Sequence, residues 1–440
     1  MKALKTIMPA VLSLMLLGAC GARAGQVRLG FDVSHPMMLA GHRQTAYLKV
    51  GLTGLALASE HERAPVNVAI VLDRSGSMSG KKLSRAKQAA IMAIDRLGRD
   101  DIVSVVAYNQ NVSVLVPATK VSDKQAIFNA INRLYAGGMT ALFGGVSKGA
   151  QETRKFLERN QVNRVILLSD GLANIGPSSP DALAELGASL IKEGISVTTI
   201  GLGLGYNEDL MVKLARASDG NHAFVEGPEQ LAQIFNYEFG DILSVVANDV
   251  DVVITCGVGV RPVRVLGREA DIVGQTVTTR LNQIYGRQQK YILLEVEVEA
   301  SAAGQTRPLA SVAVDYTDMA TKHKAHLAAS KKVIFTGSAQ LVKDNTNSKV
   351  MVAAVEQIAN ETSKRALALR DQGKIGQARK ILLGNERYLN DNANKYNSKR
   401  LKSFGLRNRG DADNLSPEKW DRQRKRMRKM QYEFDAQQAW

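Results

Sequence analysis

The feature that most constrains this chain is a stretch, residues 66–246, in which short apolar runs alternate with amphipathic segments. Residues 68–72 and 165–168 are continuously apolar, as expected of strands buried on both faces of a parallel sheet. Apolar residues between these runs recur every three or four positions, as in Leu83, Ala86, Ala90, Ile94 and Leu97. This spacing predicts helices. Strands that alternate with helices predict an α/β fold with a doubly wound, mostly parallel sheet.

The segments on either side of this stretch follow a different pattern. In residues 294–299 every second residue is apolar, which predicts a strand with one buried face and one face in water. Residues 26–60 contain similar short alternating runs. We therefore expect a β-sandwich built from 26–60 and 248–336, with the α/β domain of residues 66–246 inserted between its two parts.

The last quarter of the chain is helical and basic. Over residues 345–402 the apolar spacing predicts two helices, separated at Gly373, that form a helical hairpin. One such pair cannot bury its own apolar face, so we expect it to pack on the sandwich or on a partner. Residues 403–440 are polar and rich in lysine and arginine, which predicts a flexible basic tail.

The net charge of +16 comes mainly from this last quarter. Residues 331–440 hold 24 basic and 12 acidic side chains, whereas the chain as a whole has 58 basic and 42 acidic ones. A basic cluster of this kind is attracted to anionic lipid headgroups. Two interpretations of residues 419–429 therefore stay open: a solvated charged end, or a secondary contact with an anionic membrane or wall polymer.

The N-terminus has the pattern of an export signal, residues 1–24. Lys2 and Lys5 precede an apolar run, residues 7–17, that is too short to span a bilayer. Residues 17–20, Leu-Gly-Ala-Cys, resemble a bacterial lipobox, in which Cys20 would be acylated and anchor the chain to a membrane. Cleavage after the Ala-Arg-Ala of residues 22–24 remains an alternative and would release a soluble protein.

Export sets the expected location and excludes one class of partner. We expect a lipoprotein of the cell envelope, at the outer membrane or in the periplasm, and otherwise a periplasmic or secreted protein. Nucleic acid, the partner that a basic chain first suggests, is not expected outside the cytoplasm.

Five oxygen-bearing side chains lie at or just beyond the ends of the apolar strands. Asp73, Ser75 and Ser77 follow the first strand, Asp170 follows the second, and Thr140 lies in a Gly-Gly-Met-Thr segment between them. The carboxyl ends of parallel strands meet at one edge of the sheet, where ligands bind. Carboxylate and hydroxyl oxygens suit Mg²⁺, with Mn²⁺ or Ca²⁺ as alternatives, and a set without histidine or cysteine argues against zinc.

In this order, the five residues resemble the metal-ion-dependent adhesion site of von Willebrand factor type A domains, and the resemblance covers about residues 66–246. It implies that Ser75, Ser77 and, in one state, Thr140 bind the metal directly. It also implies that Asp73 and Asp170 act largely through water and that a sixth coordination position is open. A cation held mainly by neutral oxygens favours an incoming anion, so a partner protein's Asp or Glu carboxylate is expected there.

The wider layout of the chain resembles calcium-activated chloride-channel-like proteins and inter-alpha-trypsin inhibitor heavy chains. The expected function is a metal-dependent protein-binding, adhesion or scaffold module of the bacterial envelope, and not an enzyme. Two alternatives remain open. One is a metal-dependent hydrolase of an envelope substrate, which needs a general base near the open position. The other is a structural assembly protein that the metal only stabilises.

Overall fold

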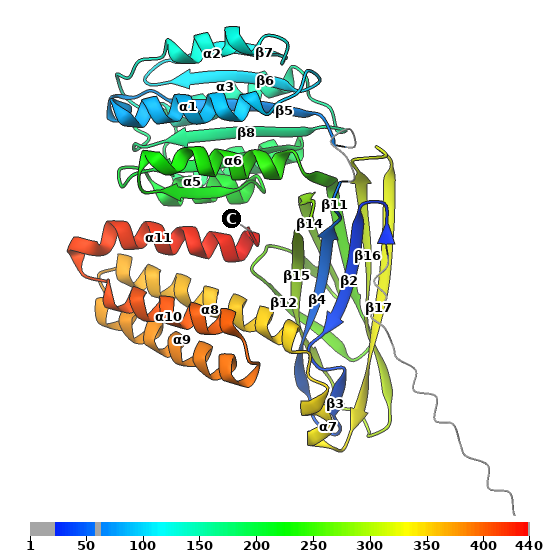
Figure 1. Cartoon of the computed structure of the whole chain (residues 1–440). Helices are drawn as coiled ribbons and strands as arrows, with labels where there is room; N and C mark the ends of the chain where they lie inside the picture. The colour runs from blue at the N-terminus through cyan, green and yellow to red at the C-terminus, as the bar shows by residue number, and fades with distance from the viewer. Residues whose placement is uncertain (1–22, 58–62, 439–440) are drawn as a thin grey trace, which may run out of the picture.

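The computed structural model describes residues 23–57 and 63–438, so residues 1–22 of the predicted signal peptide, with the lipobox and Cys20, lie outside the described residues. The structure has three regions: an α/β domain, a two-sheet sandwich and a group of helices that packs against both of them (Figure 1). Within the described ranges, none of the helices combines the length and the apolar character that crossing a membrane requires.

The α/β domain contains a six-stranded sheet in the order β10-β9-β8-β5-β6-β7, in which only the edge strand β7 is antiparallel to its neighbour. Its strands are β5 (Val66–Asp73), β6 (Ile102–Tyr108), β7 (Val112–Lys120), β8 (Val162–Ser169), β9 (Ile195–Leu202) and β10 (His222–Val225). Every residue of β5, β6, β8, β9 and β10 is buried, as continuous apolar runs require. The predicted α/β fold class is therefore confirmed.

Helices cover both faces of this sheet, which explains why its strands are apolar throughout. Helices α1, α2 and α6 pack on one face, and α3, α4 and α5 pack on the other. The six helices are α1 (Lys81–Asp95), α2 (Lys124–Asn132), α3 (Leu142–Arg154), α4 (Pro180–Lys192), α5 (Glu208–Ala217) and α6 (Leu231–Ile242).

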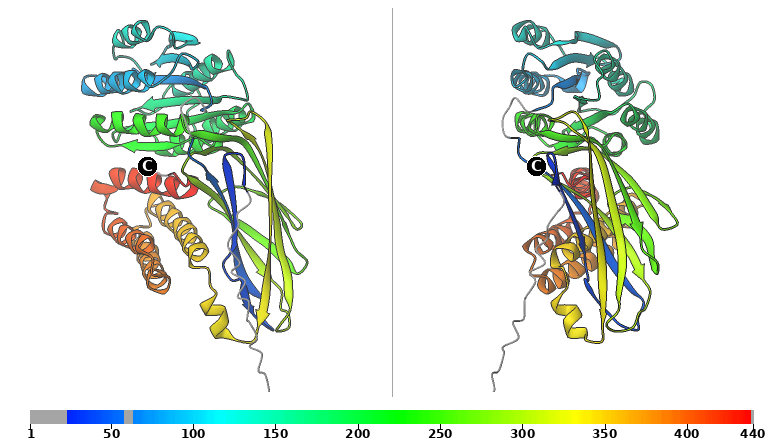
Figure 2. Two further views of the ribbon diagram at one scale, coloured as in Figure 1. Left: turned by 45° about the vertical axis from the view of Figure 1, so that its right-hand side comes forward. Right: turned by 90° about the vertical axis from the view of Figure 1, so that its right-hand side faces the viewer.

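The sandwich is built from both flanks of the α/β domain. One sheet has the order β1-β2-β4-β15-β12 and the other β13-β14-β11-β16-β17-β3, and a single apolar core lies between them (Figure 2). The strands that precede the α/β domain are β1 (Arg23–Ala24), β2 (Val27–Val33), β3 (Met37–Leu39) and β4 (Gln44–Gly54). Those that follow it are β11 (Val245–Cys256), β12 (Val260–Leu266), β13 (Asp271–Val273), β14 (Thr276–Tyr285), β15 (Gln289–Val298), β16 (Thr306–Asp318) and β17 (Lys324–Thr336). Because β4 pairs with β15 and β3 with β17, the two flanks form one folded unit.

The C-terminal region is a helical layer that packs against the sandwich. Its helices are α7 (Ala339–Asp344), α8 (Ser348–Asp371), α9 (Ile375–Lys395), α10 (Lys399–Asp413) and α11 (Pro417–Ala436). Helix α8 contacts the five-stranded sheet through Val350, Ala353 and Ala354, which pack on Leu266 and Leu293.

The prediction of a flexible tail over residues 403–440 is wrong, because helices α10 and α11 occupy nearly all of its described part. The physical reason is a set of apolar side chains that recur among the charges and are buried: Leu401, Phe404, Trp420, Met427 and Tyr432. The rings of Phe404 and Phe434 stack with their centroids 4.4 Å apart. Enough apolar surface is therefore buried to hold both helices in place.

Most of the basic side chains of α11 are paired within the protein. Arg424 contacts Asp209 at 2.5 Å and Asp371 at 2.9 Å, and it also pairs with Glu208. Arg426 contacts Glu226 at 2.7 Å. The charge on which the predicted contact between residues 419–429 and an anionic surface rests is therefore largely neutralised by acidic residues of the chain itself.

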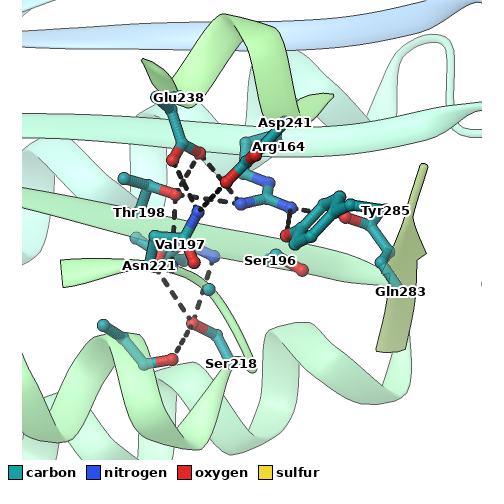
Figure 3. A network of polar contacts seen from close by, with 12 residues as sticks. Arg164, Ser196, Val197, Thr198, Ser218, Asn221, Glu238, Asp241, Gln283 and Tyr285 are labelled. Atoms are coloured by element: carbon teal, nitrogen blue, oxygen red, sulfur yellow. Dashed lines mark hydrogen bonds and ion pairs between the residues drawn. The ribbon is translucent and has the colours of Figure 1, made fainter. Parts of the chain in front are cut away.

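A buried polar network joins the α/β domain to the sandwich (Figure 3). Arg164 of β8 lies 2.9 Å from the carboxylate of Glu238 on α6, and neither side chain is exposed to solvent. The Arg164 guanidinium also donates to the Tyr285 hydroxyl of β14 at 2.8 Å. Strand β14 belongs to the sandwich, so this network helps to fix the orientation of the two regions.

Candidate metal centre

The sheet topology brings the two predicted carboxylates together. Strands β5 and β8 are parallel neighbours, with Leu72 paired to Leu168. Asp73 ends β5, and Asp170 comes directly after Ser169, the last residue of β8. Both carboxylates therefore lie at the carboxyl edge of the sheet, with exposed fractions of 0% for Asp73 and 1% for Asp170.

The two predicted serines lie between these carboxylates. The hydroxyl oxygens of Ser75 and Ser77 are 3.1 Å apart. Ser77 donates a hydrogen bond of 2.7 Å to Oδ1 of Asp170. The backbone N–H of Ser75 donates a bond of 2.8 Å to Oδ1 of Asp73. The Ser77 hydroxyl is thus within hydrogen-bonding distance of both the Ser75 hydroxyl and the Asp170 carboxylate.

Thr140 reaches the same place from the loop that precedes α3. A Cβ atom added at Gly171 would lie 3.4 Å from both Ser77 Oγ and Thr140 Oγ1, so both hydroxyls lie beside Gly171. The Thr140 backbone N–H donates to Asn174 Oδ1 at 2.8 Å, which ties this loop to the segment after Asp170. The structure therefore brings all five predicted residues to one site.

Glycine is required where the Thr140 loop meets the Ser75–Ser77 loop. Gly138 has a φ of +85°, and its carbonyl accepts a hydrogen bond of 2.9 Å from the N–H of Gly76. A Cβ atom at Gly138 would lie 1.6 Å from Gln110 Oε1. The positive φ favours glycine at this position, where the two loops meet.

Two further side chains of this centre were not predicted. The Ser169 hydroxyl donates to Oδ2 of Asp73 at 2.7 Å, and Lys82 of α1 forms an ion pair with Oδ2 of Asp170. Ser169 could have been found, because it lies in the same Ser-Asp-Gly turn as Asp170. Lys82 gives no such signal, since many lysines of the chain occupy similar positions on helices.

Burial dominates the electrostatics of the centre. It raises the pKa of Asp73, and hydrogen bonds from Ser75 and Ser169 oppose this shift. Burial, together with the nearby Asp73, raises the pKa of the Tyr108 hydroxyl well above its usual range. A cation that neutralises two buried carboxylates is favoured in such an environment.

The donor set fits a hard divalent cation. It consists of carboxylate and hydroxyl oxygens, which are the ligands that Mg²⁺, Mn²⁺ and Ca²⁺ prefer. Among residues 23–57 and 63–438 there is no cluster of three or more His, Cys, Asp or Glu side chains that could hold a metal ion. A metal at this edge of the sheet therefore depends on the serine and threonine hydroxyls.

Comparison with known families agrees with this geometry. Residues 67–236 match the von Willebrand factor type A domain. This part of the chain is a von Willebrand factor type A domain. The predicted recognition is therefore confirmed, and the domain corresponds to the sheet from β5 to β10 with its covering helices. Von Willebrand factor type A domains are commonly metal-dependent protein-interaction modules and are typically non-catalytic.

Similar sequences come from bacteria and animals. A Synechocystis protein described as the uncharacterized protein sll0103 is 29% identical over 288 residues, which cover 63% of this chain and 68% of that protein. The Escherichia coli protein YfbK is 28% identical over 212 residues, 48% of this chain and 36% of its own length. Human inter-alpha-trypsin inhibitor heavy chain H3 is 28% identical over 165 residues, 36% of this chain but 18% of its own.

Two solved structures have the same fold over most of the chain. A von Willebrand factor type A protein from Catenulispora acidiphila has a TM-score of 0.69 and 19% identity, covering 87% of this chain and 90% of its own. The ArnB paralog VWA2 from Sulfolobus acidocaldarius has a TM-score of 0.62 and 15% identity, with coverage of 93% and 98%. Because both alignments span nearly the whole chain, the likeness extends beyond the type A domain.

Proposed function

We propose that this protein binds a partner protein through a divalent cation, Mg²⁺ or alternatively Mn²⁺ or Ca²⁺, at the carboxyl edge of the type A domain. Ser75, Ser77 and, in one state, Thr140 would hold the cation through their hydroxyls, and Asp73 and Asp170 would hold it largely through water. The bound cation would supply a Lewis-acidic position that an Asp or Glu carboxylate of the partner completes.

The observation that carries this proposal is the state of Asp73. Its two oxygens already accept bonds from Ser75 N–H at 2.8 Å and from Ser169 Oγ at 2.7 Å. A carboxylate satisfied in this way is suited to an outer role, while neutral hydroxyls contact the metal. Fewer negative charges at the cation leave more of its attraction for a partner's anion.

Binding is favoured over hydrolysis by the groups around the site. A hydrolase would need a general base near the open coordination position. The carboxylates of the centre are already engaged: Asp73 accepts bonds from Ser75 and Ser169, and Asp170 accepts a bond from Ser77 and pairs with Lys82. The side chains that surround the centre thus suit the capture of an anion.

The proposed setting is the bacterial cell envelope. Residues 17–20 support export as a lipoprotein with acylated Cys20, at the outer membrane or in the periplasm, with soluble periplasmic or secreted protein as the alternative. Metabolic labelling with radioactive palmitate separates the two. We expect label on the wild type and none on Cys20→Ser, whereas an unlabelled wild type would favour the soluble form.

The binding proposal is tested with Asp73→Ala and with Asp181→Ala as a matched control, since the Asp181 side chain is 83% exposed on α4. We expect calorimetry to detect Mg²⁺ binding to the wild type and the control but not to Asp73→Ala. Cross-linked partners should co-purify with the wild type in Mg²⁺ and disappear in chelator. Identical partners in all samples would contradict the proposal. A melting temperature raised by Mg²⁺ without any metal-dependent partner would favour the structural alternative.

A further inference from the structure

Four large apolar side chains are exposed on the loops around the candidate metal centre. Their exposed fractions are 74% for Tyr135, 51% for Met139, 59% for Leu172 and 42% for Leu204. Tyr135 and Met139 lie in the segment between α2 and α3, Leu172 follows β8 and Leu204 follows β9, and we call the four together the apolar rim. Exposed apolar side chains that gather at one place commonly mark an interaction site, whereas scattered ones need no explanation.

Contacts of the first two rim residues place them beside the metal-binding loops. The guanidinium of Arg74, which lies between Asp73 and Ser75 in the chain, is 5.6 Å from the centre of the Tyr135 ring. Met139 directly precedes Thr140, and its backbone N–H donates to Gln110 at 2.9 Å. Both residues therefore border the loops that carry the hydroxyl groups.

The surroundings of the neighbouring glycines show that Leu172 and Leu204 also lie beside the centre. Leu172 follows Gly171, where an added Cβ would lie 3.4 Å from Ser77 Oγ and Thr140 Oγ1. Leu204 lies between Gly203 and Gly205. A Cβ added at Gly203 would lie 3.8 Å from Lys82 Nζ, and one added at Gly205 would lie 2.9 Å from the Asp170 carbonyl oxygen. Leu204 and Leu172 thus border the centre on the side of Asp170.

The charges around the centre favour an acidic binding partner. Arg74 and Lys82 lie beside the site, and the proposed cation adds positive charge at its middle. A lipid bilayer fits this surface poorly, because acyl chains covering the rim would also cover the carboxylates and hydroxyls inside it without offering them hydrogen bonds. A folded or extended polypeptide can supply both a carboxylate and apolar side chains.

We infer that the partner presents an Asp or Glu flanked by apolar side chains, which pack on the apolar rim while the carboxylate reaches the cation. This inference rests on the proposed metal-dependent binding. It adds a requirement on the residues beside the acidic one. Burying two apolar side chains of leucine or phenylalanine size against the rim should strengthen binding about tenfold or more.

Three biotinylated peptides serve as probes, displayed densely on a sensor so that weak single contacts add. The first carries Leu-Asp-Phe, the second Ser-Asp-Ser and the third Leu-Asn-Phe, each between glycines. In Mg²⁺ we expect the full chain to bind the first about tenfold more tightly than the second, and not to bind the third. Chelator should abolish binding of both acidic peptides.

The variant that tests the rim is Leu172→Ser combined with Leu204→Ser, with Met92→Ser as the matched control. Met92 is 53% exposed on α1 and lies outside the rim. We expect the double variant to bind the two acidic peptides equally, whereas Met92→Ser should keep the tenfold preference.

The outcomes separate this inference from the proposal beneath it. Equal Mg²⁺-dependent binding of the Leu-Asp-Phe and Ser-Asp-Ser peptides by the wild type would overturn the role of the rim and leave metal-dependent binding intact. Failure of both acidic peptides to bind in Mg²⁺ would overturn both. Binding to phosphatidylcholine vesicles that persists in chelator and is lost in the double variant would overturn the inference in favour of a membrane contact.

Discussion

Replacing Glu238 by Gln should destabilise the protein strongly, because it removes one charge of a fully buried pair. Arg164 and Glu238 are both 0% exposed. The Arg164 guanidinium donates to Glu238 Oε1 at 2.9 Å and to Thr198 Oγ1 at 3.0 Å (Figure 3). Glutamine has nearly the same shape as glutamate, so the change leaves Arg164 buried with its positive charge and without this carboxylate.

The magnitude follows from the geometry. At 2.9 Å and an effective dielectric constant of about 20, Coulomb's law gives an attraction of roughly 6 kcal/mol. Asp241 lies close enough to raise the pKa of Arg164, so it offsets part of the loss. We therefore expect Glu238→Gln to lower the free energy of unfolding by about 4 kcal/mol, within the range of about 3–5 kcal/mol typical when one partner of a buried pair is removed.

Urea unfolding followed by circular dichroism measures this loss, with Glu193→Gln as the control. Glu193 pairs with Arg154 at 2.6 Å, but these side chains are 32% and 42% exposed. Because water screens such a pair, its loss should cost less than about 1 kcal/mol. A combined Arg164→Met and Glu238→Leu variant should recover most of the stability, since no charge is then left unpaired.

One result would refute this reasoning. If Glu238→Gln and Glu193→Gln lower the free energy of unfolding by the same amount, below about 1 kcal/mol, then burial does not make the Arg164–Glu238 pair important. A loss of about 4 kcal/mol in Glu238→Gln would also indicate that this network joins the type A domain to the sandwich, because Gln283 and Tyr285 of β14 contact the Arg164 guanidinium. In that case the type A domain should unfold at lower urea than the sandwich in the variant.

Three further predictions concern the C-terminal helices and the sandwich core. Burial raises the pKa of Asp411 to about 7, so the free energy of unfolding should fall as the pH rises from about 4 through 7. Thermal melting should therefore show Asp411→Asn to be more stable than the wild type by about 2–4 kcal/mol at pH 8, and by little at pH 4. Burial also raises the pKa of the Cys256 thiol to about 11, so in a Cys20→Ser background a thiol reagent at pH 8 should react about 100-fold more slowly with the folded protein than with the protein in urea. Arg424→Ala should make α11 cleavable by trypsin within the folded protein, because Arg424 pairs with Glu208, Asp209 and Asp371; Arg379→Ala, from an exposed pair with Asp413, should not.

The α/β domain could be predicted because its strongest signals are local. The apolar runs of β5 and β8 and the amphipathic spacing of α1 are each readable within about fifteen residues. The candidate metal centre followed from one topological rule, that parallel strands end at the same edge of the sheet. Asp73 and Asp170 are 97 positions apart in the chain, yet that rule brings them together.

The parts that could not be predicted depend on contacts between distant residues. Lys425 of α11 pairs with Glu208, 217 positions away, and Arg426 pairs with Glu226, 200 positions away. Without these distant partners, the charged residues of α11 predict a solvated tail. Trp420 and Met427 are too widely spaced among the charges to predict a buried core. The burial of Arg164 could not be predicted either. An arginine next to an apolar run predicts the end of a buried strand, whereas here the ion pair with Glu238 allows the arginine to be buried within β8.

Helix α11 and the metal centre meet through one loop of the type A domain, the segment between β9 and α5. On one side of this loop, Gly205 lies against the Asp170 carbonyl oxygen, so closely that a Cβ there would lie 2.9 Å away. On the other side, Lys425 donates to the Tyr206 carbonyl at 2.9 Å and lies 4.7 Å from the centre of the Tyr206 ring. The loop that carries Leu204 of the apolar rim therefore contacts both the centre and the C-terminal helix. At the proposed site, a surface fixed in this way would lose little conformational entropy when a partner binds. Helix α11, which lies in the segment predicted to be a flexible tail, would then favour tight binding at the other side of the loop.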